Sequence, residues 1–146
     1  MAYTIEQIED AIIAALEPLK ASLGVRTIAT YQGELDVKEL SSQTSPLPAV
    51  YLIYGGSKYA EHGARKIENI AFDLILCGKS LRSDEDAKRG VYAMIEATRD
   101  ILYASDLDLQ IYPLTFDEAR PLWCTRGISV YGARYKTAQA LLYPAT

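Results

Sequence analysis

His62 is the only histidine in the sequence, and histidine is the side chain most often used as a general base or a metal ligand near neutral pH. It stands in a polar stretch, residues 55–64, with no cysteine or second histidine close by in the sequence. A metal site would lack a ligand set there. A Ser-His-Asp arrangement would have to use this one residue from a flexible segment, whereas catalytic bases need a rigid setting. We therefore expect no catalytic residue and no enzyme activity.

Asp84, Glu85 and Asp86 form the densest group of acids and could bind Mg²⁺ through their carboxylates. They directly follow Ser83, a good N-cap residue, and acids are favoured in the first turn of a helix. Helix capping therefore explains them without a ligand. The Gly55-Gly56 pair matches neither the Walker pattern nor the dinucleotide fingerprint. We expect no metal and no cofactor.

Two cysteines, Cys77 and Cys124, are present in a chain that lacks a signal-peptide pattern at its N-terminus. Isolated cysteines in such a context are typically reduced and buried as small apolar side chains. We expect both to be buried and not to form a disulfide.

Length and composition indicate one globular domain, residues 1–146, with 49% hydrophobic and 23% charged residues. The net charge of −4 argues against a broad phosphate-binding surface, so we expect no sequence-specific nucleic-acid partner. No apolar run approaches the roughly 20 residues of a membrane span, so we expect no membrane partner. Tyrosine is over-represented, with 11 residues; both protein interfaces and β-strands favour it, and composition does not separate these two explanations.

Residues 65–104 form the centre of the predicted fold, as a strand followed by a helix. In the strand, the apolar residues Ile70, Phe72, Leu74 and Leu76 alternate with a mixture of polar and apolar residues. The apolar face should therefore meet the helices, and the mixed face should be half-exposed or lie in an interface. The helix begins after Ser83 and carries one apolar stripe. We expect Gly90, inside that helix, to allow close packing on the sheet.

The N-terminal part predicts a helix over residues 4–23, with Thr4 and Gln7 as a capping box and Pro18 as a kink or end. A strand follows at residues 25–31, then a loop at residues 34–48, in which residues 36–40 could form a helical turn. A connection of that length is usually functional or mobile. Residues 49–54 form a central strand, and residues 55–64 form the turn of a hairpin that projects as an arm.

The C-terminal part predicts a turn at residues 105–108, a short strand at 109–114, an irregular segment at 116–123 and a last strand at 125–135. Residues 137–146 are too short for a stable lone element. The element order is α-β-β-β-α-β-β. It predicts an α+β fold with a single mixed, mostly antiparallel sheet and two helices on one face.

This arrangement resembles the tail-terminator proteins of tailed phages, and within them the Mu-like prophage minor tail family. The resemblance is carried by the opening helix, Pro-Ala-Val-Tyr-Leu at 48–52, the Gly-Gly arm, the strand at 70–76, Ala-Thr-Arg-Asp-Ile-Leu at 97–102 and Gly-Ile-Ser-Val-Tyr at 127–131. It implies a ring, usually of six copies, that stops tail-tube polymerisation and joins tail to head, with no catalytic residues. It also implies a place in the virion tail, reached by assembly in the host cytoplasm. The partners would be the chain itself and the tail-tube protein, with the sheath and the head–tail connector as further candidates.

Basic residues on or beside the predicted strands and arm form either a solvated sheet face or a face that meets an acidic partner or lines a ring lumen. They are Lys58, Arg65, Lys66, Arg126, Arg134 and Lys136. As contact residues in a ring we select Lys58, Tyr59, Arg65, Arg126 and Tyr131. Two alternatives stay open at this point: a head–tail connector or tail-completion protein, and a small-molecule-binding α+β domain.

Overall fold

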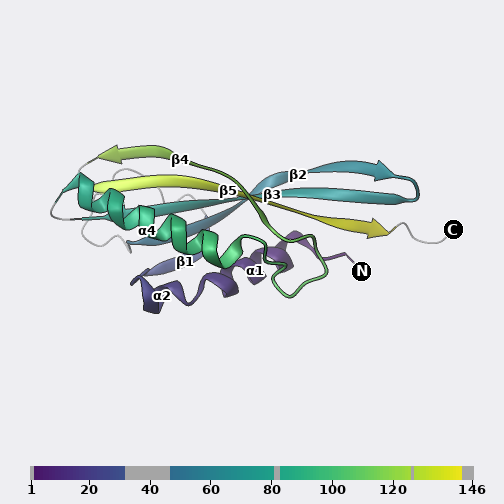
Figure 1. Ribbon diagram of the computed structural model, residues 1–146, viewed down its shortest axis with the longest axis horizontal. Helices are drawn as coiled ribbons and strands as arrows, with labels where there is room; N and C mark the ends of the chain where they lie inside the picture. Colours follow the sequence, from purple (N-terminus) through teal and green to yellow (C-terminus); the bar gives the residue numbers. More distant parts are fainter. Residues whose placement is uncertain (1, 32–46, 81–82, 126, 143–146) are drawn as a thin grey trace.

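Five strands form one sheet in the computed structural model, which describes residues 2–31, 47–80, 83–125 and 127–142 (Figure 1). The order across the sheet is β1-β2-β3-β5-β4, with β1 parallel to β2 and every other pair antiparallel. The strands are β1 Thr27–Thr30, β2 Ala49–His62, β3 Arg65–Lys79, β4 Thr115–Thr125 and β5 Ile128–Leu142. The expected single mixed sheet is confirmed, and residues 49–54 lie inside it as predicted.

Within the described residues, three helices precede or interrupt the strands: α1 Ile5–Leu16, the one-turn α2 Leu19–Ser22 and α4 Asp84–Leu102. Thr4 and Gln7 form the predicted capping box at the start of α1. Pro18 divides the predicted helix in two, because it cannot donate the backbone hydrogen bond that a continuous helix needs. Ser83 caps α4 by accepting a hydrogen bond from the Asp86 backbone at 3.1 Å, as predicted.

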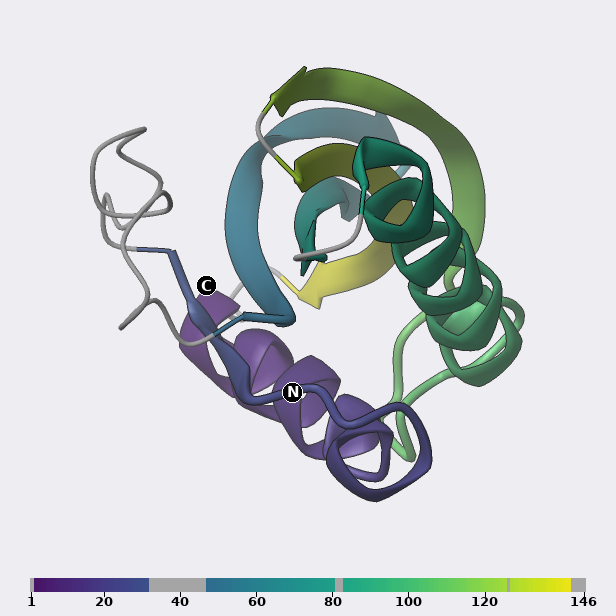
Figure 2. The same ribbon diagram turned by 90° about the vertical axis from the view of Figure 1, so that its left-hand side faces the viewer.

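Both α1 and α4 cover the same side of the sheet, which we call the helix face. One core joins Ile8 and Ile12 of α1, Val91 of α4, and Phe72 and Leu74 of β3. Figure 2 shows the strong twist of the strands seen from their end, with the two helices beside them. The predicted α+β class, with the helices on one face, is confirmed.

The opposite side of the sheet, the open face, carries a second and smaller apolar cluster. Ile75 and Cys77 lie there with Tyr51, Val130 and Leu47, and all five are buried. Asn69 is exposed and Asp73 half-buried on the same face of β3. The mixed face of this strand is therefore already covered within the chain at one end, and only its other end is available to a partner.

The C-terminal third differs from the prediction. Residues 109–114 form no strand but belong to the loop between α4 and β4, in which Leu107 and Asp108 have φ near +60° and Leu114 is fully buried. Residues 116–123 belong to the edge strand β4. Two register shifts, next to Glu118 and Trp123, break its alternation, so the sequence pattern did not reveal a strand.

The strands β2 and β5 are longer than predicted. β2 continues from Tyr54 to His62 through a bulge at Gly55, and β5 continues past Tyr135 to Leu142. Residues 137–142 are thus not a lone segment: they pair with β3 from Ile70 to Arg65. The long connection at residues 34–48 has only Leu47 and Pro48 in the described part, and its predicted helical turn lies outside it.

Two expectations about single residues were wrong. A Cβ at Gly90 would meet nothing within 4 Å, whereas one at Gly78 would lie 2.6 Å from the Val91 side chain and 2.9 Å from the Ala87 carbonyl oxygen. Close packing of helix on sheet therefore needs Gly78 and not Gly90. Cys77 and Cys124 are both free thiols as expected, but only Cys77 is buried. Burial raises the pKa of the Cys77 thiol to about 12.

Candidate protein interface

A three-stranded arm extends from the body of the molecule. It consists of residues 56–62 of β2, 65–69 of β3 and 138–142 of β5, and its outer part lies beyond both helices (Figure 1). Seven residues of extended chain span roughly 20 Å. The sequence predicted a projecting hairpin here, but not the third strand. Lys58, Tyr59 and Arg65, three of the predicted contact residues, all lie on this arm.

The outer edge of β2 in the arm is unpaired in the described chain. β1 accompanies β2 only from Ala49 to Leu52. The outer edge of β5 is held near the arm's base instead, because the Tyr112 backbone donates a hydrogen bond to the Ala138 carbonyl oxygen at 2.9 Å. An unpaired strand edge is a template for pairing with another chain.

The helix face of the arm satisfies its polar groups internally. Glu68, 7% exposed, accepts hydrogen bonds from the Tyr59 hydroxyl at 3.1 Å and from Nε2 of Gln139 at 2.8 Å. Gln139 also donates to the Tyr3 carbonyl oxygen and accepts from the Tyr3 N–H, both at 2.9 Å. Lys66 lies over the Tyr59 ring, 5.3 Å from its centroid. This network anchors the arm to the N-terminus.

The open face of the arm has a different character. Strand register places Lys58, Ala60, Arg65, Ile67, Asn69, Ala138 and Ala140 on it. Lys58 and Arg65 are exposed and form no ion pair within the described residues, and the two acids of the arm, Glu61 and Glu68, lie on the helix face. Small apolar side chains with unneutralised cations beside them are suited to a partner that carries apolar and acidic groups.

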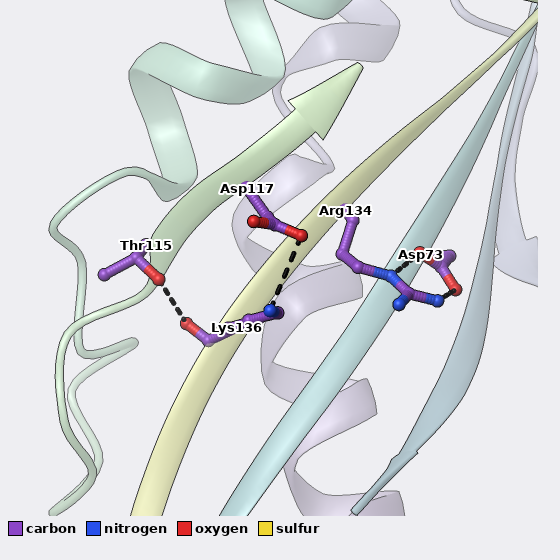
Figure 3. A network of polar contacts seen from close by, with 5 residues as sticks. All are labelled: Asp73, Thr115, Asp117, Arg134 and Lys136. Atoms are coloured by element: carbon purple, nitrogen blue, oxygen red, sulfur yellow. Dashed lines mark hydrogen bonds and ion pairs between the residues drawn. The ribbon is translucent and has the colours of Figure 1, made fainter. Parts of the chain in front are cut away.

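Next to the arm, the open face carries two ion pairs, drawn in Figure 3. Arg134 binds Asp73 through two hydrogen bonds, Nε to Oδ1 at 2.8 Å and Nη2 to Oδ2 at 3.0 Å. The hydrogen bonds that the Arg134 guanidinium donates to Asp73 raise the pKa of Arg134. Lys136 lies 3.5 Å from Asp117 across the β4–β5 pair. These two cations are neutralised. Glu118 and Arg120 of β4 are exposed on the same face and form no ion pair within the described residues, so the unpaired charge there is of both signs, whereas on the open face of the arm it is only positive.

Tyr131, a fourth predicted contact residue, lies away from the arm. It pairs with Leu76, which lies seven residues along β3 from Asn69, the partner of Lys58, or about 23 Å at 3.3 Å per residue. Its ring meets Tyr92 of α4 edge-on at 5.6 Å, and the two hydroxyls are 3.3 Å apart. The hydrogen bond with Tyr92 raises the pKa of Tyr131. The fifth, Arg126, lies outside the described residues.

Sequence reasoning did not single out several exposed tyrosines. Tyr54, Tyr92, Tyr103 and Tyr112 are 38–58% exposed, as is Tyr59. Tyr51 and Tyr135, in contrast, are buried in the strands. The tyrosines therefore form two groups, one buried in the strands and one exposed and available to a partner, and only exposure in the folded chain distinguishes them.

The residues considered for catalysis or metal binding are not brought together. His62 ends β2 at the tip of the arm, and Glu85 pairs with Arg89 at 2.9 Å on α4. Among the described residues, no three His, Cys, Asp or Glu side chains are placed to share a metal ion. No helix in the described ranges is both long and apolar enough to span a bilayer.

A hollow beside the β2 bulge is one candidate for a small-molecule site. Gly55, Lys58, Asn69 and Arg134 contribute to its lining, and its volume is about 260 Å³. Ligand pockets usually measure roughly 300–1,000 Å³ and enclose most of the ligand. This hollow is smaller, and two of its three cations, Arg134 and Lys136, are already paired, so it does not favour ligand binding there.

Comparisons with known proteins agree with the fold. One solved chain, from "Virion of native gene transfer agent (GTA) particle", matches with a TM-score of 0.61 and 16% identity over 94% of this chain and 98% of that one. At this identity the match establishes a shared fold. No curated protein matches the chain. The model of the family described as "Bacteriophage Mu, Gp37" matches residues 4–140, nearly the whole sequence. The chain therefore belongs to the bacteriophage Mu Gp37 family.

Proposed function

We propose that the chain is a structural protein of a phage or prophage particle, and specifically a tail terminator: a ring subunit that caps the tail tube and joins tail to head. Membership of a bacteriophage family supports the structural role. The similar fold of a chain from a gene transfer agent virion supports it further. In this proposal the protein acts through contacts alone, without catalysis or a cofactor, in a particle assembled in the host cytoplasm.

The arm is the observation that carries the proposal. A three-stranded sheet with one face and one edge open to a partner is poorly used in a monomer, since open edges invite association. A ring formed by head-to-tail contacts would use one arm per copy. Six copies would agree with the tail-terminator resemblance of the sequence.

Tube polymerisation in the presence of the chain tests this function. The tail-tube protein from the same genome is allowed to polymerise with and without the chain, and tube lengths are measured by electron microscopy. A terminator would shorten the tubes in proportion to its concentration and would appear as extra density at one end. Unchanged tube lengths and bare tube ends would contradict the proposal, and binding only to a head-side connector would favour the connector alternative.

A further inference from the structure

On one face of the arm the polar side chains are paired within the chain, and on the other face the charged side chains are not. On the helix face, Glu68 and Gln139 bind each other and Tyr3, and Lys66 covers the Tyr59 ring. On the open face, Lys58 and Arg65 are exposed without an ion pair in the described chain, and Ala60, Ala138 and Ala140 lie with them in register. The open face is therefore the one that offers unused charge and apolar surface to a partner.

A complementary surface exists elsewhere on the same chain. The outer side of α1 carries exposed Glu6 and Asp10, with half-buried Glu9 beside them, and α1 itself contains no basic residue. None of these three acids forms an ion pair within the described residues, whereas Glu17, just after the helix, pairs with Lys20 at 2.7 Å. Exposed Ala14 continues the side of the helix on which Glu6 and Asp10 lie, so a partner can approach that side closely.

We propose that the open face of the arm docks on the acidic outer side of α1 in a second copy of the chain, with Lys58 and Arg65 facing Glu6, Glu9 and Asp10. The two surfaces belong to different parts of the molecule, so the contact is head-to-tail and repeats from copy to copy. A repeated contact of this kind closes into a ring when its rotation allows. This proposal rests on the proposed ring function and names the contact that builds the ring.

The charges of the two surfaces favour a second copy of the chain as the partner of the arm. Cations without acids on one surface meet acids without cations on the other, so each set can neutralise the other. A sequence-specific nucleic acid would be repelled by α1 and would find only two unpaired cations on the open face of the arm. The arm's reach of roughly 20 Å matches the roughly 18 Å length of a 12-residue helix.

Charge reversal on each surface provides the test. One variant carries Lys58→Glu and Arg65→Glu, a second carries Glu6→Lys and Asp10→Lys, and a third carries all four changes. Self-association is measured by sedimentation velocity at low ionic strength, with thermal melts to verify folding. Each single-surface reversal should weaken association at least about tenfold, because it places like charges opposite one another. The four-fold variant should associate within about threefold of the wild type, because opposite charges face each other again.

Mixing gives a second readout. Chains with a reversed arm and chains with a reversed helix have matching surfaces only for each other, so a 1:1 mixture should form alternating assemblies although neither variant associates alone. Matched controls reverse the same number of charges elsewhere, Arg26→Glu with Lys88→Glu and Glu96→Lys with Asp100→Lys, and should associate as the wild type does.

The proposal fails if the arm and helix reversals behave like the controls, or if neither the four-fold variant nor the mixture recovers association. In that case, wild-type chains that still form rings and shorten tubes would leave the proposed function standing. Wild-type chains that neither associate nor affect tubes would overturn both.

Discussion

Arg134 and Asp73 form a two-bond ion pair across β5 and β3, with N–O distances of 2.8 and 3.0 Å, at the point where the body of the sheet passes into the arm. The arginine side chain is 40% exposed and the aspartate 28% exposed. Solvent therefore partly screens the ion pair, and its contribution to stability depends on its two-bond geometry more than on burial.

A double-mutant cycle should measure that pair. We expect Arg134→Gln and Asp73→Asn to show a coupling energy of about 1 kcal/mol in urea unfolding at low salt, falling as salt is added. The Lys136–Asp117 pair serves as the control, because it is longer at 3.5 Å and its side chains are 54% and 41% exposed. Its coupling should stay below about 0.5 kcal/mol. Equal coupling in both pairs would show that the two-bond geometry has no special value.

The buried network at the base of the arm should be costly to break. Gln139→Leu removes a donor from Glu68 and leaves the Tyr3 N–H without its acceptor. We expect a loss of about 2–4 kcal/mol in the free energy of unfolding, because buried polar groups are left unsatisfied. Gln110→Leu is the control, since only its backbone bonds to the Tyr3 hydroxyl. That change should cost less than about 0.5 kcal/mol, and a similar loss in both variants would refute the account.

Replacing Gly90 or Gly78 by alanine should change the stability of the protein in opposite directions. Gly90→Ala should stabilise the protein by about 0.5–1 kcal/mol, because the site is exposed and alanine is the better helix former. Gly78→Ala should destabilise it by about 1–3 kcal/mol, because the added Cβ would lie 2.9 Å from the Ala87 carbonyl oxygen of α4. Thermal melts of the two variants decide the matter. A stabilising Gly78→Ala would mean that α4 can move away from the sheet.

Glu9 gives a dependence on pH. Partial burial, together with the charges of Asp10 and Glu6, raises the pKa of this carboxyl above 4.5. A raised folded-state pKa means that protonation favours folding, so the contribution is complete below pH 4.5 and is lost as pH rises through the folded-state pKa. Glu9→Gln should therefore stabilise the isolated chain by about 0.2–0.5 kcal/mol at pH 7 and have almost no effect at pH 4. The exposed Glu96→Gln is the control; a Glu9→Gln gain that persists at pH 4 would contradict this explanation.

Local patterns predicted the elements that have one clear apolar face. The period of α4, the alternation of Ile70, Phe72, Leu74 and Leu76, and the caps at Thr4 and Ser83 are all present in the structure. These features depend on neighbouring residues, which the sequence displays directly.

The missed elements depend on contacts between distant residues. β4 is exposed on most of its length and interrupted by two irregularities, so it has no alternating pattern to read. Residues 137–142 form a strand only because β3 extends far enough to pair with them. The same limit applies to the candidate interface. Three residues selected from the sequence, Lys58, Tyr59 and Arg65, lie on the arm. Which face of the arm has its polar groups paired within the chain depends on strand register, which the sequence does not display.

The mass of the protein in solution tests the central claim most directly. Native mass spectrometry over a range of concentrations at low ionic strength, alone and with the tail-tube protein, measures the number of copies in the assembly. The account predicts one closed species, expected at six times the 16.2 kDa of a single chain, that dissociates as salt is raised. A mass of 16.2 kDa at every concentration, with and without the tube protein, would contradict it.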